Sequence, residues 1–212
     1  MAEHLLDIHN LSVCYPDIQL LSGLSLSVDR GQIVCVCGES GCGKTSLLNA
    51  IIGFADSEGT VSIDGNLLNA DSVDLLRKQV AYVPQELALP HETVREMVRV
   101  PFMLKANRHI PFSEEALLNE WKYLNLSESL LDKRVSEISG GQRQRIMLSV
   151  AGLLQKPLLL VDEPTSALDV DSAMLVLDYF RMLASERQMG ILVVSHHKDF
   201  ASGCDTIINL SR

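Results

Sequence analysis

The stretch "QIVCVCGESGCGKTSLLNAIIG", residues 32–53, decides the fold. Its first part, residues 32–37, is a short and nearly continuous apolar run, which is typical of a strand covered on both faces in a parallel sheet. Glycines follow, and "TSLLNAIIG" then predicts a helix that ends at Gly53. A buried strand, a glycine-rich turn and a helix in this order predict an α/β fold.

The glycine-rich turn has the spacing of a phosphate-binding loop. Gly38, Gly43, Lys44 and Thr45 complete the pattern G-x-x-x-x-G-K-[ST] between the strand and the helix. Backbone N–H groups of such a loop, with the helix N-terminus, face the β-phosphate of a nucleotide. We expect Lys44 to reach the β- and γ-phosphate oxygens and the Thr45 hydroxyl to coordinate Mg²⁺. The alternative, a glycine-rich turn that matches by chance, is disfavoured by the flanking strand and helix.

The expected nucleotide-binding residues of this loop are Gly38, Glu39, Ser40, Gly41, Cys42, Gly43, Lys44, Thr45 and Ser46. Cys42 is either a small filler or a thiol close to the nucleotide, and the filler interpretation is favoured. Cys35 and Cys37 form a C-x-C pair, and we interpret them as buried small hydrophobic residues rather than as metal ligands, because no second cysteine pair lies nearby.

Further strands are expected at 60–63, 80–83, 158–162 and 190–195. A helix at 172–188 separates the last two, and its apolar residues fall on one face. This order predicts a right-handed crossover between parallel strands.

Two regions of the chain do not follow this pattern of alternating strands and helices. Residues 5–14 and 20–28 alternate loosely around a turn at 16–17, which predicts an antiparallel β layer. Helical patterns and proline breaks at Pro90, Pro101 and Pro111 fill the region from 86 to about 150. We therefore expect a P-loop NTPase parallel-sheet core with an N-terminal antiparallel β subdomain and an inserted α-helical subdomain. All of it forms one domain, 1–212, with 1–84 and 151–212 as the nucleotide-binding core and 85–150 as the helical subdomain.

Composition excludes several classes of protein. The net charge is −9 and no dense Lys/Arg cluster occurs, which argues against nucleic acid as a partner. No apolar window is long enough to span a membrane, and the N-terminus lacks the pattern of an export signal. Five cysteines, an odd number, mostly in or beside apolar runs, fit a reducing cytosol.

The strand at 158–162 ends in two adjacent carboxylates, Asp162 and Glu163. Neighbours on a strand point to opposite sides, so the two need not share a task. We expect Asp162 to hold Mg²⁺ through water and Glu163 to polarise the water that attacks the γ-phosphate. The alternative is a solvated acidic turn.

The strand at 190–195 is followed by His196 and His197. The carboxyl end of a parallel strand faces the crevice where ligands bind in open α/β sheets. Taken alone, either histidine reads as a surface residue. Taken with the other motifs, His196 is expected to contact the γ-phosphate, and His197 to be structural.

The stretch "SEISGGQRQR", residues 136–145, adds a second anion site, because it places a serine and two glycines at the start of a helix. The set "GESGCGKT", "YVPQ", "ISGGQRQR", "LLLVDEPTSALD" and "VVSHH", in this order, resembles the nucleotide-binding subunit of ATP-binding cassette (ABC) transporters. The resemblance covers nearly the whole chain. It implies that two copies pack head to tail, so that Ser139, Gly140, Gly141 and Gln142 of one copy close over the γ-phosphate held by the other.

The resemblance implies three further roles. Tyr15 is similar to the aromatic residue that stacks on adenine, Gln85 to the glutamine that touches Mg²⁺, and Asp169 to the residue that contacts the opposite copy. For Gln85 the alternative is a solvated loop residue. Ile138 replaces the commoner leucine before "SGGQ", a change that conserves volume.

The expected function is an ATPase subunit that uses ATP and Mg²⁺ and drives a separate transmembrane permease subunit. The subunit would work as a homodimer or pseudo-dimer, peripheral on the cytoplasmic face of a membrane, and a short single-cassette chain suits a bacterial inner membrane. The alternative is a non-transport relative that regulates a membrane-bound complex, such as a division complex.

Overall fold

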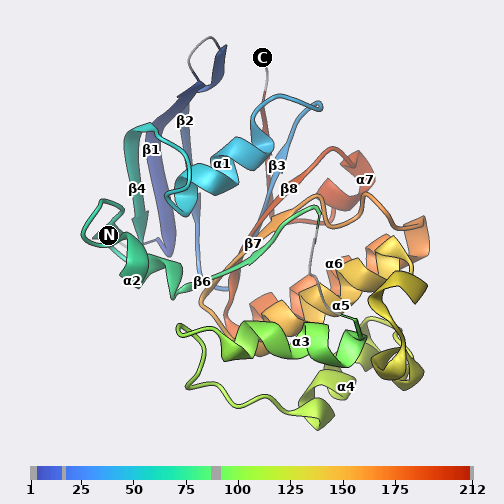
Figure 1. The fold of residues 1–212 in the computed structure, drawn as a ribbon. Helices are drawn as coiled ribbons and strands as arrows, with labels where there is room; N and C mark the ends of the chain where they lie inside the picture. The colour runs from blue at the N-terminus through green and yellow to red at the C-terminus, as the bar shows by residue number, and fades with distance from the viewer. Residues whose placement is uncertain (1–3, 16–17, 87–91, 211–212) are drawn as a thin grey trace.

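The computed structural model describes residues 4–15, 18–86 and 92–210 (Figure 1). In chain order, its elements are β1 Leu6–Tyr15, β2 Ile18–Val28, β3 Ile33–Cys37, α1 Lys44–Ile51, β4 Glu58–Ile63, β5 Asn66–Leu67, α2 Val73–Arg77, β6 Val80–Val83, α3 Val94–Met103, α4 Glu114–Tyr123, the 3₁₀ helices η1 Glu128–Asp132 and η2 Val135–Glu137, α5 Gly140–Leu153, β7 Leu158–Asp162, α6 Val170–Arg187, β8 Gly190–Ser195, α7 Lys198–Ala201 and β9 Thr206–Asn209. None of the helices in the described part of the chain is long and apolar enough to cross a membrane.

The centre of the fold is a five-stranded sheet in the order β6-β7-β8-β3-β9. All its strand pairs are parallel. Every residue of β3, β7 and β8 is buried, as the continuous apolar runs predict. The expected parallel-sheet core is thus confirmed, and the carboxyl ends of its strands share one edge.

The antiparallel layer is also confirmed. Its four strands have the order β2-β1-β4-β5, and Leu6 of β1 pairs with Val28 of β2 and with Ile63 of β4. The expected turn at 16–17 lies outside the described residues. One hydrophobic core joins this sheet to α1 and to one face of the parallel sheet, and α1 lies between the two sheets in Figure 1.

The opposite face of the parallel sheet is covered by α6. Of the residues that the sequence placed on one face of this helix, Ala173 is half-buried and the other five are buried, namely Val176, Leu177, Phe180, Leu183 and Ala184. These five belong to a second hydrophobic core that also contains the buried residues of α3, α4 and α5. The central sheet is therefore sandwiched between helices, as in other doubly wound folds.

Helices occupy the described residues between β6 and β7, and these helices gather on one side of the molecule in Figure 1. The expected break at Pro101 is wrong, because α3 continues through this residue to Met103. A proline near the end of a helix removes a backbone donor where few turns remain to be disturbed. Pro111 does precede α4, and Pro90 lies outside the described residues. The subdomain boundaries at 85 and 150 stay a prediction.

A buried polar contact ties the helical region to α6. Glu120 of α4 is 4% exposed and accepts hydrogen bonds from the Tyr179 hydroxyl and the Arg187 guanidinium, both on α6. Next to it, the Trp121 indole donates to the Ser149 hydroxyl on α5, at 3.1 Å. These contacts join three helices through side chains that have little access to water.

Replacing Glu120 should therefore destabilise the whole fold. Glu120→Ala leaves the Arg187 charge and the Tyr179 hydroxyl without their shared acceptor, and breaking a buried ion pair in this way costs about 3 kcal/mol or more. We expect a loss of this size in the free energy of unfolding measured with urea. Glu115→Ala, at an exposed position of the same helix, is the control, and equal stabilities of the two variants would contradict the structural role of Glu120.

Candidate nucleotide-binding and hydrolytic site

A cavity of about 530 Å³ lies at the carboxyl ends of β3 and β7. The lining residues are Leu20, Glu39, Ser40, Gly41, Gly43, Lys44, Thr45, Ser46, Gln85, Asp162, Glu163 and His196. They come from separate parts of the sequence, and all except Leu20 are among the expected site residues. The parallel sheet brings them together because its strands end at the same edge.

The phosphate loop depends on glycine at Gly43. This residue has a φ of 94°, and a Cβ placed on it would lie 2.7 Å from the backbone oxygen of Leu20. It is also the N-cap of α1, where no side chain accepts a hydrogen bond from the first turn. The first N–H groups of α1 therefore have no intrahelical partner and are placed to bind phosphate oxygens.

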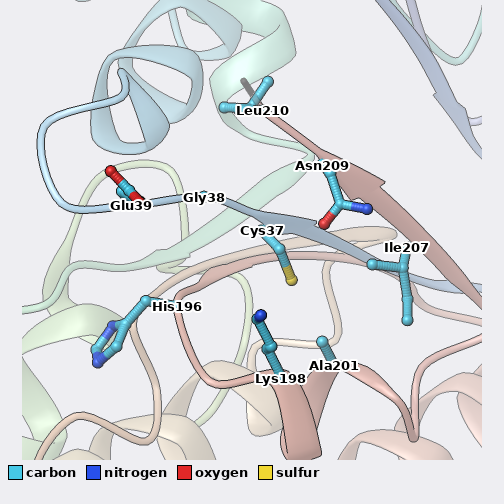
Figure 2. Close-up of a pocket in the computed structure, with 9 residues that line it drawn as sticks. All are labelled: Cys37, Gly38, Glu39, His196, Lys198, Ala201, Ile207, Asn209 and Leu210. Carbon is cyan, nitrogen blue, oxygen red and sulfur yellow. The ribbon is translucent and has the colours of Figure 1, made fainter. Parts of the chain in front are cut away.

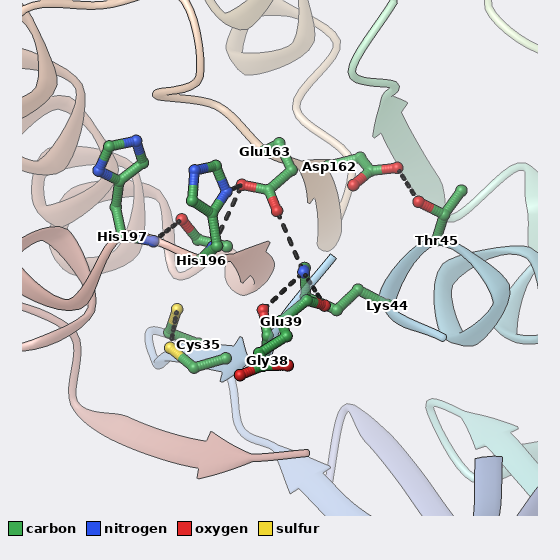
Figure 3. Close-up of polar contacts among 11 residues, drawn as sticks. Cys35, Gly38, Glu39, Lys44, Thr45, Asp162, Glu163, His196 and His197 are labelled. Atoms are coloured by element: carbon green, nitrogen blue, oxygen red, sulfur yellow. Dashed lines mark hydrogen bonds and ion pairs between the residues drawn. The ribbon is translucent and has the colours of Figure 1, made fainter. Parts of the chain in front are cut away.

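Lys44 directs its ammonium into this loop. The side chain is 7% exposed, and Nζ donates to the carbonyl oxygens of Gly38 at 2.7 Å and Glu39 at 3.0 Å. Nζ also forms an ion pair with Oε1 of Glu163, at 3.3 Å. Figure 3 shows Lys44 between the loop and the end of β7. The ammonium thus lies where a phosphate would compete for it.

Thr45 and Asp162 form the part of the site that fits a metal ion. The Thr45 hydroxyl donates to Oδ2 of Asp162 at 2.8 Å, whereas Oδ1 of Asp162 is buried without a hydrogen-bond partner. Burial raises the pKa of Asp162, and the hydrogen bond from Thr45 opposes this shift. A carboxylate oxygen without a partner beside a hydroxyl is the oxygen-rich environment that Mg²⁺ prefers. Gln85, an exposed residue, lines the same cavity.

Glu163 is held by partners on three sides. Its Oε2 accepts hydrogen bonds from the His196 backbone N–H at 3.2 Å and from the His196 ring at Nδ1, 2.8 Å away. Its Oε1 faces Lys44, and its own N–H donates to the Val194 oxygen at 2.9 Å. The backbone of Glu163 has a φ of 46°, a left-handed conformation that is uncommon outside glycine.

The contact between Glu163 and His196 is a feature that sequence reasoning missed. The sequence assigned His196 to the γ-phosphate, and this role stays a prediction. In the structure, His196 also orients the carboxylate expected to act on the attacking water (Figure 3). His197 does not line the cavity, and its N–H donates to the Ser195 hydroxyl at 3.1 Å.

Cys42 does not line the 530 Å³ cavity. Cys42 is 6% exposed, and its Sγ packs against Gly38, where an added Cβ would approach it to 2.4 Å. This packing agrees with the filler interpretation. The backbone of Tyr15 ends β1, whereas its side chain is outside the part of the structure that is described, so stacking on adenine stays a prediction.

A second cavity, of about 490 Å³, lies on the other side of the loop, towards β9 (Figure 2). It shares Glu39 and His196 with the first cavity. Cys37 and Lys198 point into it from β3 and α7. His196 is therefore reachable from two sides, which agrees with its half-exposed side chain.

The "SGGQ" residues begin α5 and cap it. Ser139 is the N-cap, its hydroxyl accepting from the Gln142 N–H at 3.1 Å while Oε1 of Gln142 accepts from the Ser139 N–H at 3.0 Å. Gly140 lies at the helix start, and a Cβ on Gly141 would come within 2.8 Å of the Ala167 oxygen. Within one chain, the described residues that line the 530 Å³ cavity include none of these.

Asp169 caps α6, accepting a hydrogen bond from the Ser172 N–H at 2.7 Å. This hydrogen bonding lowers the pKa of Asp169. The residue is exposed and does not line the cavity, so the expected contact with an opposite copy stays a prediction.

The loop, the lysine and the strand-end carboxylates define the class of this protein, a P-loop nucleotide-hydrolysing domain. A profile of the ABC transporter family matches residues 21–166. The chain belongs to this family and carries its ATP-binding, ATP-hydrolysing cassette.

Known relatives and structures agree with this assignment. The carnitine transport ATP-binding protein OpuCA of Listeria monocytogenes is 35% identical over 184 residues, which cover 85% of this chain and 46% of OpuCA. The probable iron export ATP-binding protein FetA of Escherichia coli K12 is 29% identical over 207 residues, covering 97% of this chain and 91% of FetA. A dimeric structure of the ATP-binding cassette MJ0796, bound to ADP and Pi in a post-hydrolysis state, superposes with a TM-score of 0.85 at 27% identity, covering 97% of this chain and 94% of that one.

The chain is shorter than several of these relatives. It spans about half the length of OpuCA, 46%, and of the sulfate/thiosulfate import protein CysA of Synechocystis, 54%.

The unpartnered oxygen of Asp162 leads to a prediction about stability. Asp162→Asn removes a buried charge, so its melting temperature without nucleotide should equal or exceed that of the parent chain. The extra thermal stabilisation that Mg²⁺ adds to bound ATP should be lost in this variant. Differential scanning calorimetry with ATP, with and without Mg²⁺, measures both, and Asp171→Asn is the exposed control. An unchanged Mg²⁺ effect would remove Asp162 from the metal site.

Proposed function

We propose that this chain is the ATP-hydrolysing subunit of an ABC transporter and that it drives a separate transmembrane permease. The observation that carries the proposal is the cluster of Lys44, Glu163 and His196 around the phosphate loop, with Thr45 and Asp162 beside it. This cluster supplies a phosphate cradle, a carboxylate base with a fixed orientation and an oxygen-rich metal site.

The residues divide the chemistry of hydrolysis between them. Lys44 moves its hydrogen bonds from the carbonyls of the loop to the β- and γ-phosphate oxygens. Glu163 then accepts a proton from the attacking water, while the two hydrogen bonds from His196 hold its Oε2 in place. Thr45 and Asp162, with Gln85 nearby, would hold Mg²⁺, which neutralises phosphate charge when bound.

Two copies are needed to complete the site. Ser139, Gly140, Gly141 and Gln142 do not line the nucleotide cavity of their own chain, yet they stand at the start of a 14-residue helix, where Ser139 and Gly140 are exposed. Such a helix end attracts anions. We propose that it closes over the γ-phosphate of a second copy packed head to tail, with Asp169 at the interface, and that ATP acts as the link between the copies.

The proposed partner is a transmembrane permease subunit, and this chain would bind it from the cytoplasmic face of the membrane, with a bacterial inner membrane as the setting. One relative is the probable ABC transporter ATP-binding/permease protein of Haemophilus influenzae, whose name joins the two functions. This chain carries exposed apolar residues at the end of α3 and of α4, Met103, Leu104 and Tyr123, which suit a protein partner. From the sequence we expect residues 87–102 to carry the groove for a coupling helix of the membrane subunit, and the structure describes this segment from 92 onward.

Glu163→Gln tests the catalytic assignment. The amide keeps the shape of the side chain but accepts a proton far less readily, so ATP hydrolysis should fall about 10²–10⁴-fold while ATP affinity changes little. Steady-state phosphate release and equilibrium binding of ATP measure the two quantities. Glu186→Gln, at an exposed position of α6, should hydrolyse ATP normally. Turnover of Glu163→Gln at the parental rate would remove Glu163 from the mechanism.

Ser139→Arg tests the head-to-tail arrangement. In the Glu163→Gln background, ATP·Mg²⁺ should convert the chain from monomer to dimer in light scattering, because hydrolysis no longer releases the link. Adding Ser139→Arg should abolish the dimer, since a long cation at the helix start obstructs the approach of the neighbouring chain. Ser57→Arg, an exposed substitution away from the site, should leave the dimer intact. An ATP-bound monomer in the Glu163→Gln background would contradict closure by the isolated chain.

Co-purification separates transport from its alternative. A solute-transporting permease recovered with the chain supports the proposal. A membrane-bound complex that moves no solute would favour the regulatory class of ABC ATPase instead.

A further inference from the structure

A separate cavity, of about 490 Å³, lies at the opposite end of the parallel sheet from the nucleotide. Its lining residues are Arg30, Gln155, Lys156, Pro157, Arg187, Gln188 and Met189. They precede β3, β7 and β8, whereas the phosphate loop and the catalytic residues follow the same strands. Strands of five to six residues separate the two ends by about 16–20 Å. This cavity, called here the basal cavity, is therefore distinct from the nucleotide site.

The basal cavity is basic in a protein whose net charge is −9. Its described lining includes Arg30, Lys156 and Arg187 and contains no acidic residue. Two of these cations have carboxylate partners. Arg30 pairs with Asp64 at 2.8 Å, and Arg187 pairs with Glu120 and donates to the Gly152 oxygen at 3.1 Å. The positive charge that is left over belongs to Lys156.

The Lys156 side chain is largely buried, its ammonium keeps some contact with solvent, and none of the described carboxylates pairs with it. Lys156 is 6% exposed, and no hydrogen bond or ion pair joins it to any other residue that the structure describes. Burial lowers its pKa, and no neighbouring charge opposes that shift. Lys44 provides the comparison within the same chain, because it is equally buried and has three oxygen partners.

This arrangement costs stability and has no evident role in folding. A cation largely shielded from water and without a counterion is unfavourable, whereas the stem of a lysine packs much like a methionine. Buried polar groups that destabilise the fold are common at functional sites, where a bound ligand supplies the missing interactions. A cavity of this volume is in the range of small-molecule sites, and its walls include the aliphatic surfaces of Pro157 and Met189.

We propose that the basal cavity binds a small oxyanion, a phosphate or carboxylate group, whose charge is neutralised by Lys156. The arginines Arg30 and Arg187 flank the ligand and strengthen the positive field while each keeps its own carboxylate partner. The site lies between the turn after α5, which leads into β7, and the turn after α6, which leads into β8. A bound anion would therefore hold together the ends of two strands whose other ends carry Glu163 and His196.

Calorimetric titration tests the proposal. The full chain is used as Glu163→Gln loaded with ATP·Mg²⁺, so that the phosphate loop is already filled. Inorganic phosphate and succinate are titrated separately at a constant ionic strength set with chloride. We expect at least one of them to bind, and Lys156→Met in the same background to bind it at least tenfold more weakly. Lys78→Met changes an exposed lysine whose side chain has no hydrogen bond or ion pair to a described residue, and this variant should bind like the parent.

Thermal melting is a second measurement, and it distinguishes an anion-binding lysine from one that only stabilises the fold. Without anion, Lys156→Met should melt at or above the temperature of the parent, because it removes an unpaired charge from a largely buried side chain. With anion, the parent should gain stability and Lys156→Met should not. Lys156→Gln serves the same comparison if the methionine variant does not fold.

The possible results are distinct. Binding of phosphate alone or of succinate alone identifies the ligand group and supports the site. Binding of neither anion to the parent, or equal binding to parent and Lys156→Met, overturns the proposal. Failure of the ATP-dependent dimer described above would leave these measurements unaffected, because the two sites lie at opposite ends of the sheet.

Discussion

The parallel pairing of β3, β8 and β7 is the constraint on which the rest of the structure depends. In this register Cys37 pairs with Ser195, and Asp162 with Val194, so three strands end together. The phosphate loop, the two carboxylates and His196 each follow one of these ends. Chemical groups more than a hundred residues apart in sequence, such as Thr45 and Asp162, thereby come within 2.8 Å of each other. A slip of one residue would turn the carboxylates to the wrong faces.

The same edge concentrates charge that a stable fold would otherwise keep in water. Lys44, Asp162 and Glu163 are all buried, and Glu163 adopts a left-handed backbone conformation. The ion pair between Lys44 and Glu163 compensates two of these charges, whereas Asp162 keeps an oxygen without a partner. At the other end of the sheet, Lys156 has no partner in the described structure. Both unpaired groups lie beside cavities, which is where binding of an ion would offset their burial.

Much of the fold was predictable because its signals are local. The apolar runs of β3, β7 and β8 and the single apolar face of α6 follow directly from periodicity, and they are confirmed. Other elements were missed or misjudged. β9 has only four residues and alternates between half-buried and exposed positions, so it has no strong pattern of its own and exists by pairing with β3. At Pro101, packing of the buried face of α3 outweighs the local preference for a break.

The sequence by itself determined the residue types of the site. The spacing of the phosphate loop is a local pattern that is specific to nucleotide binding, and so is the pair of carboxylates after an apolar strand. The sequence also indicated that these residues follow strands of a parallel sheet. Only the tertiary structure decided how they meet. The hydrogen bonds from His196 to Glu163, the isolation of "SGGQ" from its own nucleotide cavity and the uncompensated charge of Lys156 depend on which distant segments face one another. Such contacts arise from the packing of strands and helices, and no local pattern encodes them.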